Sequence, residues 1–170
     1  MPNAFTRVPS PVGELVLVAS ESGIRAVYFP TSRHGPPPTG SEWEEDDGRR
    51  PTSELLDRAR RQLSEYFAGI RTTFDVPLDP VGSTFQRRVW DALRLIPYGT
   101  TLSYRELARR LGDARATRAV GAANARNPIP IIVPCHRVIG AHGELTGFGG
   151  GLDRKRWLLE HEGALLPLEH

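Results

Sequence analysis

The sequence predicts an α+β protein, with a small N-terminal domain of antiparallel β-sheet and helix followed by a mainly helical C-terminal domain. Strand-like runs rich in valine and isoleucine lie before residue 80, and capped helical patterns follow it. The stretch Pro80-Val81-Gly82 separates these regions, so we place the domains at residues 1–80 and 81–168. A chain of 170 residues is long enough for two such domains. The second domain is expected to hold a helix-turn-helix and an active-site loop.

The N-terminal domain begins with two strand-like runs, at residues 15–19 and 24–29. A short polar turn separates them, which predicts an antiparallel hairpin. Residues 30–51 contain three consecutive prolines and an acidic cluster, so they are expected to form a mobile loop. Apolar residues at helical spacing predict a helix over residues 54–67, and residues 74–78 are expected to form a further short strand.

Three helices are predicted in the C-terminal domain. A Ser-x-x-Gln capping pattern begins at Ser83 and opens a helix that Pro97 stops. A Ser-x-x-Glu pattern at Ser103 opens a second helix, which closes at Gly112. Residues 116–126 form the third helix. The last two helices are joined by a glycine-bearing turn, which predicts a helix-turn-helix.

The charges of the two domains differ in sign. Residues 1–80 carry 9 basic and 12 acidic side chains, and residues 81–170 carry 13 basic and 8 acidic side chains. The second domain therefore has an excess of positive charge, which favours a nucleic acid or another anionic partner. The third helix is rich in alanine and glycine and contains Arg118 and Arg126. Arg115 directly precedes it. Its small residues indicate either close packing or a close approach to DNA.

Several classes of protein are excluded by composition. No apolar stretch reaches the ~18–20 residues that a membrane span needs, and no signal peptide is expected. The single cysteine excludes an internal disulfide and cysteine-rich zinc sites, and the five histidines show no ligand-like spacing, so no metal site is predicted. A reactive thiol survives best in a reducing compartment, which predicts a cytoplasmic location.

That single cysteine, Cys135, follows an apolar run and is itself followed by His136. A thiol beside an imidazole can be held as the thiolate, which is the nucleophilic form. A lone cysteine can equally be a small buried hydrophobic residue. The pair alone therefore leaves two interpretations, a nucleophile or a core residue.

A set of short motifs in the second domain decides between them. The chain resembles the O6-alkylguanine-DNA alkyltransferases, also called methylated-DNA–protein-cysteine methyltransferases, from about Phe85 to Gly163. No single motif is specific, but their joint occurrence in this order is. The motifs are Phe85-Gln86-Arg87-Arg88-Val89-Trp90, Ile96-Pro97-Tyr98-Gly99, Ser103-Tyr104, Arg118-Ala119-Val120-Gly121, Asn127-Pro128, Ile132-Val133-Pro134-Cys135-His136-Arg137-Val138, Gly147-Phe148-Gly149-Gly150-Gly151-Leu152 and Trp157-Leu158-Leu159-Glu160-His161-Glu162-Gly163.

The resemblance implies a direct-reversal DNA repair reaction that uses no cofactor. Cys135 would attack the alkyl carbon on the O6 atom of guanine, and His136 would act as its base through a water molecule. Glu162 would orient the imidazole, as in a catalytic triad. Tyr104 would donate a proton to the departing base. The thioether formed cannot be hydrolysed, so each molecule would react once. O4-alkylthymine stays open as a second substrate.

The same resemblance implies how double-stranded DNA is bound. The alkylated nucleotide must be flipped out of the stack, and Arg118 would fill the gap from the minor groove. Asn127 would structure the turn beneath the nucleophile, and the carbonyls of Cys135 and Val138 would accept hydrogen bonds from guanine. Phe148, Gly149 and Gly150 would form the pocket wall, where glycine lets the backbone approach a ligand. A monomer is expected, and cooperative binding along DNA is left open.

Three other functions compete with this one. A non-catalytic sensor of alkylguanine lesions typically carries tryptophan at the nucleophile position, so Cys135 argues against it. A helix-turn-helix transcription regulator would leave the Pro-Cys-His-Arg-Val run unexplained. A cysteine hydrolase would need an oxyanion hole and a hydrolysable acyl intermediate.

Overall fold

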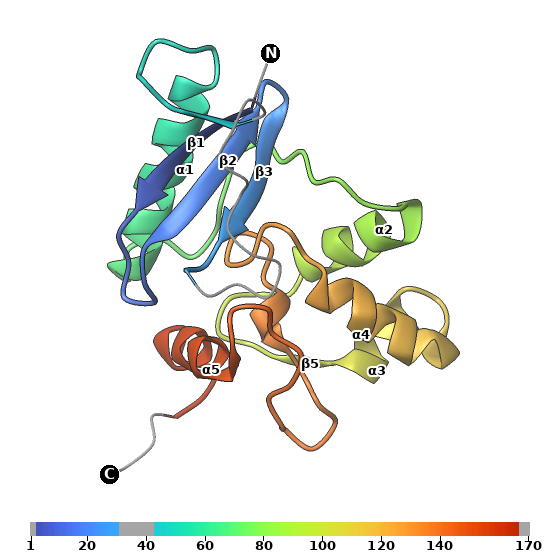
Figure 1. Ribbon diagram of the computed structural model, residues 1–170. Helices are drawn as coiled ribbons and strands as arrows, with labels where there is room; N and C mark the ends of the chain where they lie inside the picture. The colour runs from blue at the N-terminus through green and yellow to red at the C-terminus, as the bar shows by residue number, and fades with distance from the viewer. Residues whose placement is uncertain (1–2, 31–42, 167–170) are drawn as a thin grey trace. The chain divides into compact units, whose positions relative to one another are not determined.

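The computed structural model describes residues 3–30 and 43–166, and the chain forms two compact units, residues 1–81 and 82–170. Figure 1 shows the strands β1–β3 and helix α1 in the first unit, and helices α2–α5 in the second. Of the loop predicted over residues 30–51, residues 31–42 lie outside the described part. Within the described ranges no helix is long and apolar enough to cross a membrane.

The first unit is built on a four-stranded sheet with the order β3-β2-β1-β4. Strands β2 (Leu15–Ser20) and β3 (Gly23–Tyr28) form the predicted antiparallel hairpin, with an irregularity in register between Val18 and Ala19. Strand β1 (Asn3–Val8) pairs antiparallel with β2. The predicted sheet is therefore confirmed, and it is extended on one side of β2.

The strands β1 and β4 were not predicted. The residues of β1 include Ala4 and Thr6, which are too small or too polar to give a clear alternating pattern. Strand β4 (Trp43–Glu45) lies inside the segment predicted to be a loop, and it pairs parallel to β1. Two of its three residues are acidic, so its strand conformation comes from pairing with the edge of the sheet rather than from its own sequence.

Helix α1 (Ser53–Phe67) covers one face of the sheet, as Figure 1 shows. Its buried side chains recur at helical spacing and pack against the apolar face of the strands. Gly69 follows the helix with a φ of 78°, a conformation that glycine adopts without strain. The core of this unit is apolar, and its fully buried members include Leu15, Leu17, Ile24, Leu56, Leu63 and Tyr66.

The predicted strand at residues 74–78 is wrong. This segment makes only one isolated bridge within the described part of the chain, between Leu78 and Ile24 of β3. Pro77 has no N–H group to continue a ladder, and its carbonyl instead accepts from the Ile24 amide at 2.9 Å. A side chain on Gly23 would collide with this carbonyl, because a Cβ there would lie 2.7 Å from it.

The second unit begins with α2 (Thr84–Leu93), whose predicted capping box is confirmed. The Ser83 hydroxyl accepts from the Gln86 amide, and the Gln86 side chain accepts from the Ser83 amide. The helix ends at Leu93, a few residues before the predicted stop at Pro97, because the chain continues in tighter turns that bury Ile96.

The predicted helix-turn-helix is formed by α3 (Tyr104–Arg110) and α4 (Thr117–Ala125). Ser103 caps α3 by accepting from the Glu106 amide, and Gly112 turns the chain with a φ of 97°. A short 3-10 turn, η1 (Ala114–Ala116), precedes α4. Helix α4 packs against both α2 and α3, as Figure 1 also shows.

Two short strands and a helix complete this unit, and none of them was predicted. The two-residue strands β5 (Leu102–Ser103) and β6 (Val138–Ile139) pair in parallel, which joins segments far apart in sequence. Helix α5 (Leu152–His161) follows the glycine-rich stretch and packs against η2 (Cys135–Arg137). These contacts bring separate segments of the unit together around residue 135.

Candidate active site

Cys135 lies at the start of η2 and is only 6% exposed. The segment before it is shaped by Asn127, whose side-chain amide donates to the Val133 carbonyl at 2.8 Å. The amide oxygen of Asn127 accepts from the Ile129 amide at 3.0 Å. The buried Asn127 side chain therefore fixes both ends of the turn that leads to Cys135. The resemblance implied this location for Asn127, beneath the nucleophile.

Within this turn the backbone is strained at Ile131. Its φ of 74° lies in the left-handed region, which a β-branched residue rarely occupies. The side chain is 1% exposed, and the Val133 amide donates to the Ile129 carbonyl at 2.9 Å across the turn. Burial and hydrogen bonding together hold Ile131 in a left-handed backbone conformation that isoleucine rarely adopts.

His136 and Glu162 form a buried pair, with Nε2 of the imidazole 2.7 Å from Oε2 of the carboxylate. A carboxylate accepts hydrogen bonds, so Nε2 carries the proton and Nδ1 is left as an acceptor. Nδ1 is buried and has no hydrogen-bond partner within the described part of the chain. The imidazole is therefore oriented by Glu162, and its other nitrogen is available to take a proton.

Arg137 holds Glu162 from the other side. Its Nε donates to Oε1 at 2.8 Å and its Nη2 donates to Oε2 at 3.1 Å. The remaining Nη1 donates to the Ile96 carbonyl at 2.7 Å, and the guanidinium lies over the Tyr98 ring. A two-point contact of this kind fixes the carboxylate plane as well as its position.

These contacts set the charges of the pair. Burial by itself would raise the pKa of Glu162, but hydrogen bonds from His136 and Arg137 and the charge of Arg137 lower it to about 2. Burial lowers the pKa of His136, although the hydrogen bond and charge of Glu162 act in the opposite direction. At neutral pH the carboxylate is charged and the imidazole is neutral, so it can serve as a base.

The thiol of Cys135 is protonated at rest. Burial raises its pKa, and this effect exceeds the lowering by a hydrogen bond from the Asn127 side chain and by the positive charge of Lys155. His136 turns its Nε2 toward Glu162, so the adjacency seen in the sequence does not produce a thiolate through this nitrogen. A proton acceptor is needed when the thiol reacts.

Tyr104 is the first residue of α3, and the pairing of Ser103 with Ile139 places it beside the segment that follows Cys135. Its hydroxyl donates to the Thr146 carbonyl at 2.9 Å, and the Thr146 hydroxyl lies 3.3 Å from it. Burial raises the pKa of Tyr104, and the nearby Cys135 adds to this effect. Tyr104 is therefore a protonated phenol close to the cysteine.

The other predicted pocket residues lie on β6 and the glycine-rich stretch. Val138 is fully buried, Phe148 and Gly150 are buried, and Gly149 is partly exposed. Glycine is required structurally at Gly147, which has a φ of 66° and where a Cβ would lie 3.1 Å from the Tyr104 hydroxyl. At Gly149 a Cβ would meet no described atom within 4 Å, so this position leaves open space.

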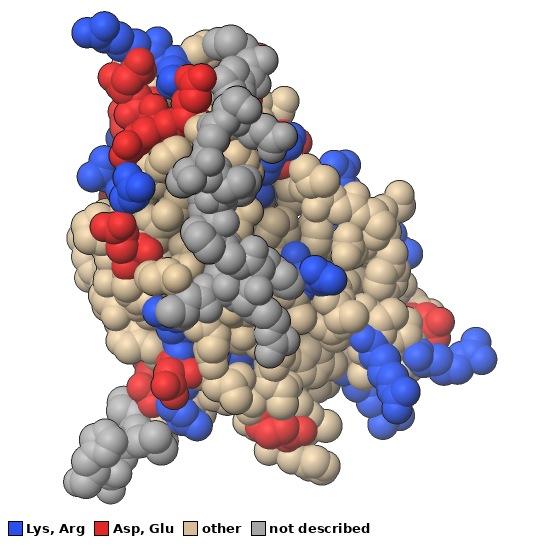
Figure 2. Space-filling view, viewed as in Figure 1, with Lys and Arg blue, Asp and Glu red and all other residues tan. Residues whose placement is uncertain are grey.

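Arg118 is exposed near the start of α4, in contrast to the buried pair of His136 and Glu162. The helix has two faces, which reconciles the two interpretations of its small residues. Val120, Ala123 and Asn124 are buried, and the Trp90 indole donates to the Ala123 carbonyl at 2.9 Å. The outer face of the helix exposes Arg118, Ala119 and Ala122, with the exposed Arg115 of η1 before the helix and the exposed Arg126 directly after it. Figure 2 shows basic side chains, all of them arginines in this region, projecting around α3 and α4.

Three residues of the site were not predicted. Arg137 lies in the Pro-Cys-His-Arg-Val motif, and a basic residue directly after Cys-His is a usable signal for a partner of the buried carboxylate. Lys155 is fully buried on α5. Because arginines flank it in the sequence, the pattern suggests an exposed basic surface instead. Asn124 is buried on α4 and donates to the Cys135 carbonyl at 3.4 Å. No pattern in the sequence signals this last contact.

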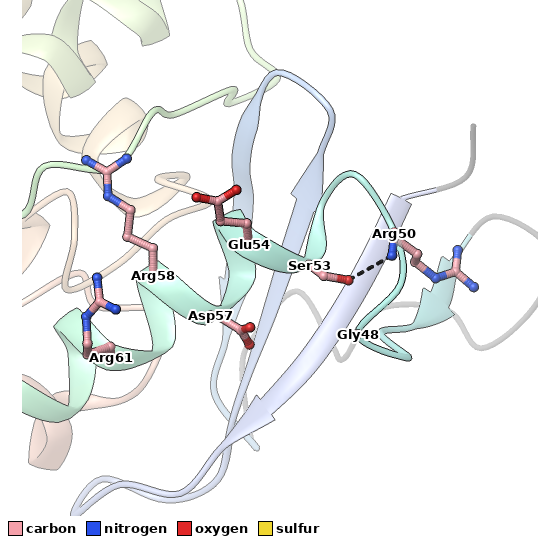
Figure 3. Close-up of a pocket in the computed structure, with 7 residues that line it drawn as sticks. All are labelled: Gly48, Arg50, Ser53, Glu54, Asp57, Arg58 and Arg61. Atoms are coloured by element: carbon pink, nitrogen blue, oxygen red, sulfur yellow. Dashed lines mark hydrogen bonds between the residues drawn. The ribbon is translucent and has the colours of Figure 1, made fainter.

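The first unit carries a separate hollow of about 460 Å³, shown in Figure 3. Its lining has both signs of charge, and two of its arginines are paired, Arg50 with Glu44 and Arg58 with Asp75. Figure 3 shows Asp57 pointing away from Arg58 and Arg61. None of the predicted site residues lines this hollow, which is formed by Gly48, Arg50, Ser53, Glu54, Asp57, Arg58 and Arg61.

Comparison with known families covers nearly the whole chain. Residues 84–164 match the family described as "6-O-methylguanine DNA methyltransferase, DNA binding domain". Residues 4–80 match the family described as "6-O-methylguanine DNA methyltransferase, ribonuclease-like domain". The similarity seen in the sequence between Phe85 and Gly163 therefore extends into the N-terminal unit.

Individual relatives agree with this match. Proteins named methylated-DNA--protein-cysteine methyltransferase are similar along most of their length. The one from Methanosarcina acetivorans is 48% identical over 155 residues, covering 91% of this chain and 95% of the relative. The one from Mycobacterium tuberculosis is 47% identical over 165 residues, covering 97% and 95%. The crystal structure of Mycobacterium tuberculosis OGT in complex with DNA has a TM-score of 0.84 and 48% identity, covering 94% of this chain and 92% of that one.

Proposed function

The chain belongs to the 6-O-methylguanine DNA methyltransferase family, whose members repair DNA by alkyl transfer, and we propose that Cys135 accepts the alkyl group from O6-alkylguanine in duplex DNA. One observation carries the assignment of the residues. The single cysteine of the chain is buried next to an imidazole whose Nε2 is engaged by Glu162 and whose Nδ1 has no partner within the described residues. A thiol nucleophile needs a base to take its proton, and Nδ1 of His136 is an acceptor available for that role.

In the first step Nδ1 of His136 accepts the thiol proton through a bridging water, and the resulting imidazolium is stabilised by Glu162. The sulfur of Cys135 then attacks the alkyl carbon in line with the C–O6 bond. The S–C bond forms as the C–O6 bond breaks, and the electron pair of that bond remains on guanine. The raised pKa of the thiol explains why the base must act at the moment of reaction.

Guanine leaves as a neutral base if it receives a proton, and Tyr104 is placed to supply one. Its hydroxyl is protonated, close to Cys135 and held by Thr146. The tyrosinate that results is reprotonated from the imidazolium, so the thiol proton ends on guanine. The product of the reaction is a thioether at Cys135, which water does not hydrolyse, and each molecule therefore reacts once.

The outer face of α4 is suited to bind DNA. Ala119 and Ala122 allow the helix to approach the minor groove, and the flanking arginines neutralise phosphates. The alkylated base must leave the stack to reach a buried thiol, and Arg118 is long and exposed enough to occupy the space that the base vacates. We propose that the protein acts as a monomer on duplex DNA, with O4-alkylthymine a further candidate substrate.

Replacing Arg118 by alanine is expected to weaken repair of duplex DNA at least ~10-fold more than reaction with free O6-benzylguanine, because only the duplex requires flipping. The measurement is the single-turnover rate on each substrate. Arg110→Ala, an exposed arginine on α3, is the matched control for general loss of charge. Equal losses on both substrates for Arg118→Ala would exclude a role that is specific to flipping.

The proposal is tested by intact-protein and peptide mass spectrometry after incubation with an oligonucleotide that contains O6-methylguanine. One methyl group is expected on the peptide that contains Cys135, saturating at one per protein. Tight binding to the lesion without a change in mass would instead indicate a lesion sensor. A methyl group on any other residue would refute Cys135 as the acceptor.

A further inference from the structure

The hydroxyl of Tyr104 has both of its hydrogen-bonding functions engaged by one residue, Thr146. The phenol donates its proton to the Thr146 carbonyl at 2.9 Å, and the Thr146 hydroxyl donates to the phenol oxygen at 3.3 Å. Among the residues that the structure describes, no other group forms a hydrogen bond with this phenol. Thr146 is exposed and lies 42 positions from Tyr104 in the sequence. The hydrogen bonds of the phenol therefore come from a residue that no motif includes.

The ring of Tyr104 is bordered by two glycines. A Cβ on Gly121 of α4 would lie 3.7 Å from the ring, and a Cβ on Gly147 would lie 3.1 Å from the hydroxyl. Neither glycine adds a side chain that covers the phenol, so its polar contacts come from Thr146 alone within the described residues. Thr146 directly precedes Gly147 and presents both its carbonyl and its hydroxyl to the same phenol oxygen.

The phenol oxygen needs different partners once it has given up its proton. A phenol both donates and accepts, whereas a phenolate only accepts and carries a negative charge. The Thr146 hydroxyl already donates to this oxygen at rest, so it stabilises the developing charge without rearrangement. A hydrogen bond to a charged oxygen is also stronger than one to a neutral oxygen. Thr146 is therefore oriented for the product of the proton transfer as well as for the resting state.

The Thr146 carbonyl keeps a partner when the phenol proton leaves it. It accepts from two donors, the Tyr104 hydroxyl at 2.9 Å and Nζ of Lys155 at 2.7 Å. The second hydrogen bond remains after the first is broken, so release of the phenol proton does not leave an acceptor without a donor. The resting contact thus holds the phenol proton in place and does not oppose its transfer.

The charges around the phenol give the Thr146 hydroxyl an effect to oppose. Burial raises the pKa of Tyr104 and the nearby Cys135 on η2 adds to this, whereas the hydrogen bond from Thr146 lowers it. The other charged group that faces the ring is Lys155 on α5, with Nζ 5.8 Å from the ring centroid. Thr146 therefore makes a buried phenol a better acid than its surroundings alone would allow.

We propose that Thr146 is a positioning residue for alkyl transfer, whose carbonyl orients the Tyr104 hydroxyl at rest and whose hydroxyl stabilises the phenol oxygen as its proton passes to guanine. This inference rests on the proposed role of Tyr104 as the proton donor. The O–H bond of Tyr104 breaks as an N–H bond forms on guanine, and the electron pair of the O–H bond stays on the phenol oxygen. Thr146 keeps its own proton throughout.

The first experiment is a double-mutant cycle between the two residues. Thr146→Val replaces the hydroxyl by a methyl group of nearly the same shape, and it is expected to slow reaction with free O6-benzylguanine by ~3- to 10-fold. Tyr104→Phe is expected to slow the same reaction by ~10-fold or more. In the Tyr104→Phe background, Thr146→Val should add less than ~2-fold, because its effect acts through the phenol hydroxyl. Single-turnover rates measure all four proteins.

The second experiment compares two leaving groups. In O6-benzyl-8-bromoguanine the electron-withdrawing bromine lets guanine leave with less help from a proton donor, so the loss in Thr146→Val should be smaller than with O6-benzylguanine. Each variant is compared with the wild type on the same substrate, which removes differences in fit. A loss of equal size on both substrates would show that the substitution only displaces the loop, and it would overturn the proposal.

Conservative variants separate the hydroxyl from the loop. Thr146→Ser keeps the hydroxyl and should react faster than Thr146→Val. Thr146→Ala removes the hydroxyl without a branched side chain, and it should repeat the loss if valine disturbs the loop. The matched control is Thr100→Val, which removes an exposed hydroxyl that donates to the Pro97 carbonyl at 2.7 Å in the same unit. This control should keep the wild-type rate on both substrates.

The outcomes distinguish this inference from the function on which it rests. Absence of alkyl transfer in the wild-type protein would refute the proposed function. A wild-type rate in Tyr104→Phe would refute the assigned proton donor. Slow reaction of Tyr104→Phe with wild-type rates in Thr146→Val and Thr146→Ala would overturn this inference alone. An equal loss from Thr146→Val with and without the phenol hydroxyl would overturn it as well, since Thr146 would then act by another route.

Discussion

Cys135→Ser is expected to abolish methyl transfer and to leave binding to DNA unchanged. A hydroxyl is a far weaker nucleophile than a thiol, and the base positioned for a thiol does not deprotonate it to a useful extent. The fold is expected to persist, since serine is close to cysteine in size. The measurement is peptide mass spectrometry after incubation with an O6-methylguanine duplex, together with binding to the same duplex by fluorescence anisotropy.

The control for this variant is the wild-type protein after one round of reaction, which carries a thioether and should also be inactive toward fresh substrate. Both proteins should bind duplex DNA with the wild-type salt dependence, because the cations on the outer face of α4 are untouched. Methyl transfer to the introduced serine, or to any other residue of the variant, would contradict the assignment of Cys135 as the acceptor.

Glu162→Gln is expected to slow alkyl transfer by roughly 10²-fold or more, within the range seen when the orienting group of a general base is lost. The amide can still accept from His136, but it no longer stabilises the imidazolium by charge. It also leaves Arg137 as a buried cation without this counter-charge. Single-turnover rates on free O6-benzylguanine measure this effect without any contribution from DNA binding.

The same variant should change how stability depends on pH. The pKa of Glu162 is lowered from 4.5 to about 2 in the folded protein, so its contribution is complete above pH 4.5 and is lost as pH falls to about 2. That contribution is about 3 kcal/mol. Wild type should lose this free energy of unfolding between these pH values, and Glu162→Gln should lack that part of the loss.

Glu160→Gln, on the same helix, is the matched control. Glu160 pairs with Arg156 near the surface, so its removal should cost less than about 1 kcal/mol and leave the acid profile unchanged. Urea unfolding across the acid range measures both variants. An acid profile of Glu162→Gln identical to that of the wild type would show that the buried pair does not set the acid sensitivity of the fold.

The elements that could be predicted are those whose signals are local. The hairpin of β2 and β3 has β-branched residues on both sides of a turn, and α1 has apolar residues at helical spacing. The cap at Ser83 needs only two residues three positions apart. The strand β4 could not be predicted in this way, because three residues with two carboxylates become a strand only when β1 offers an unpaired edge.

The features of the site divide in the same way, into those that local motifs identify and those that depend on tertiary contacts. Cys135, His136, Tyr104, Asn127 and Glu162 were identified from motifs, and the structure brings them into one unit. What the motifs do not contain is the direction of the side chains. The resemblance implied that Glu162 orients His136, whereas the contact of Arg137 with the same carboxylate becomes clear only once α5 is placed against η2.

By itself the sequence determined the family, the two-part α+β fold and the expected nucleophile, because each of these depends on residue types and short spacings along the chain. Only the tertiary structure decided the protonation of the site. Whether Cys135 is a thiol and whether His136 is neutral depend on burial and on partners distant in sequence. Desolvation and charge act through space, so a linear pattern of residues does not report them.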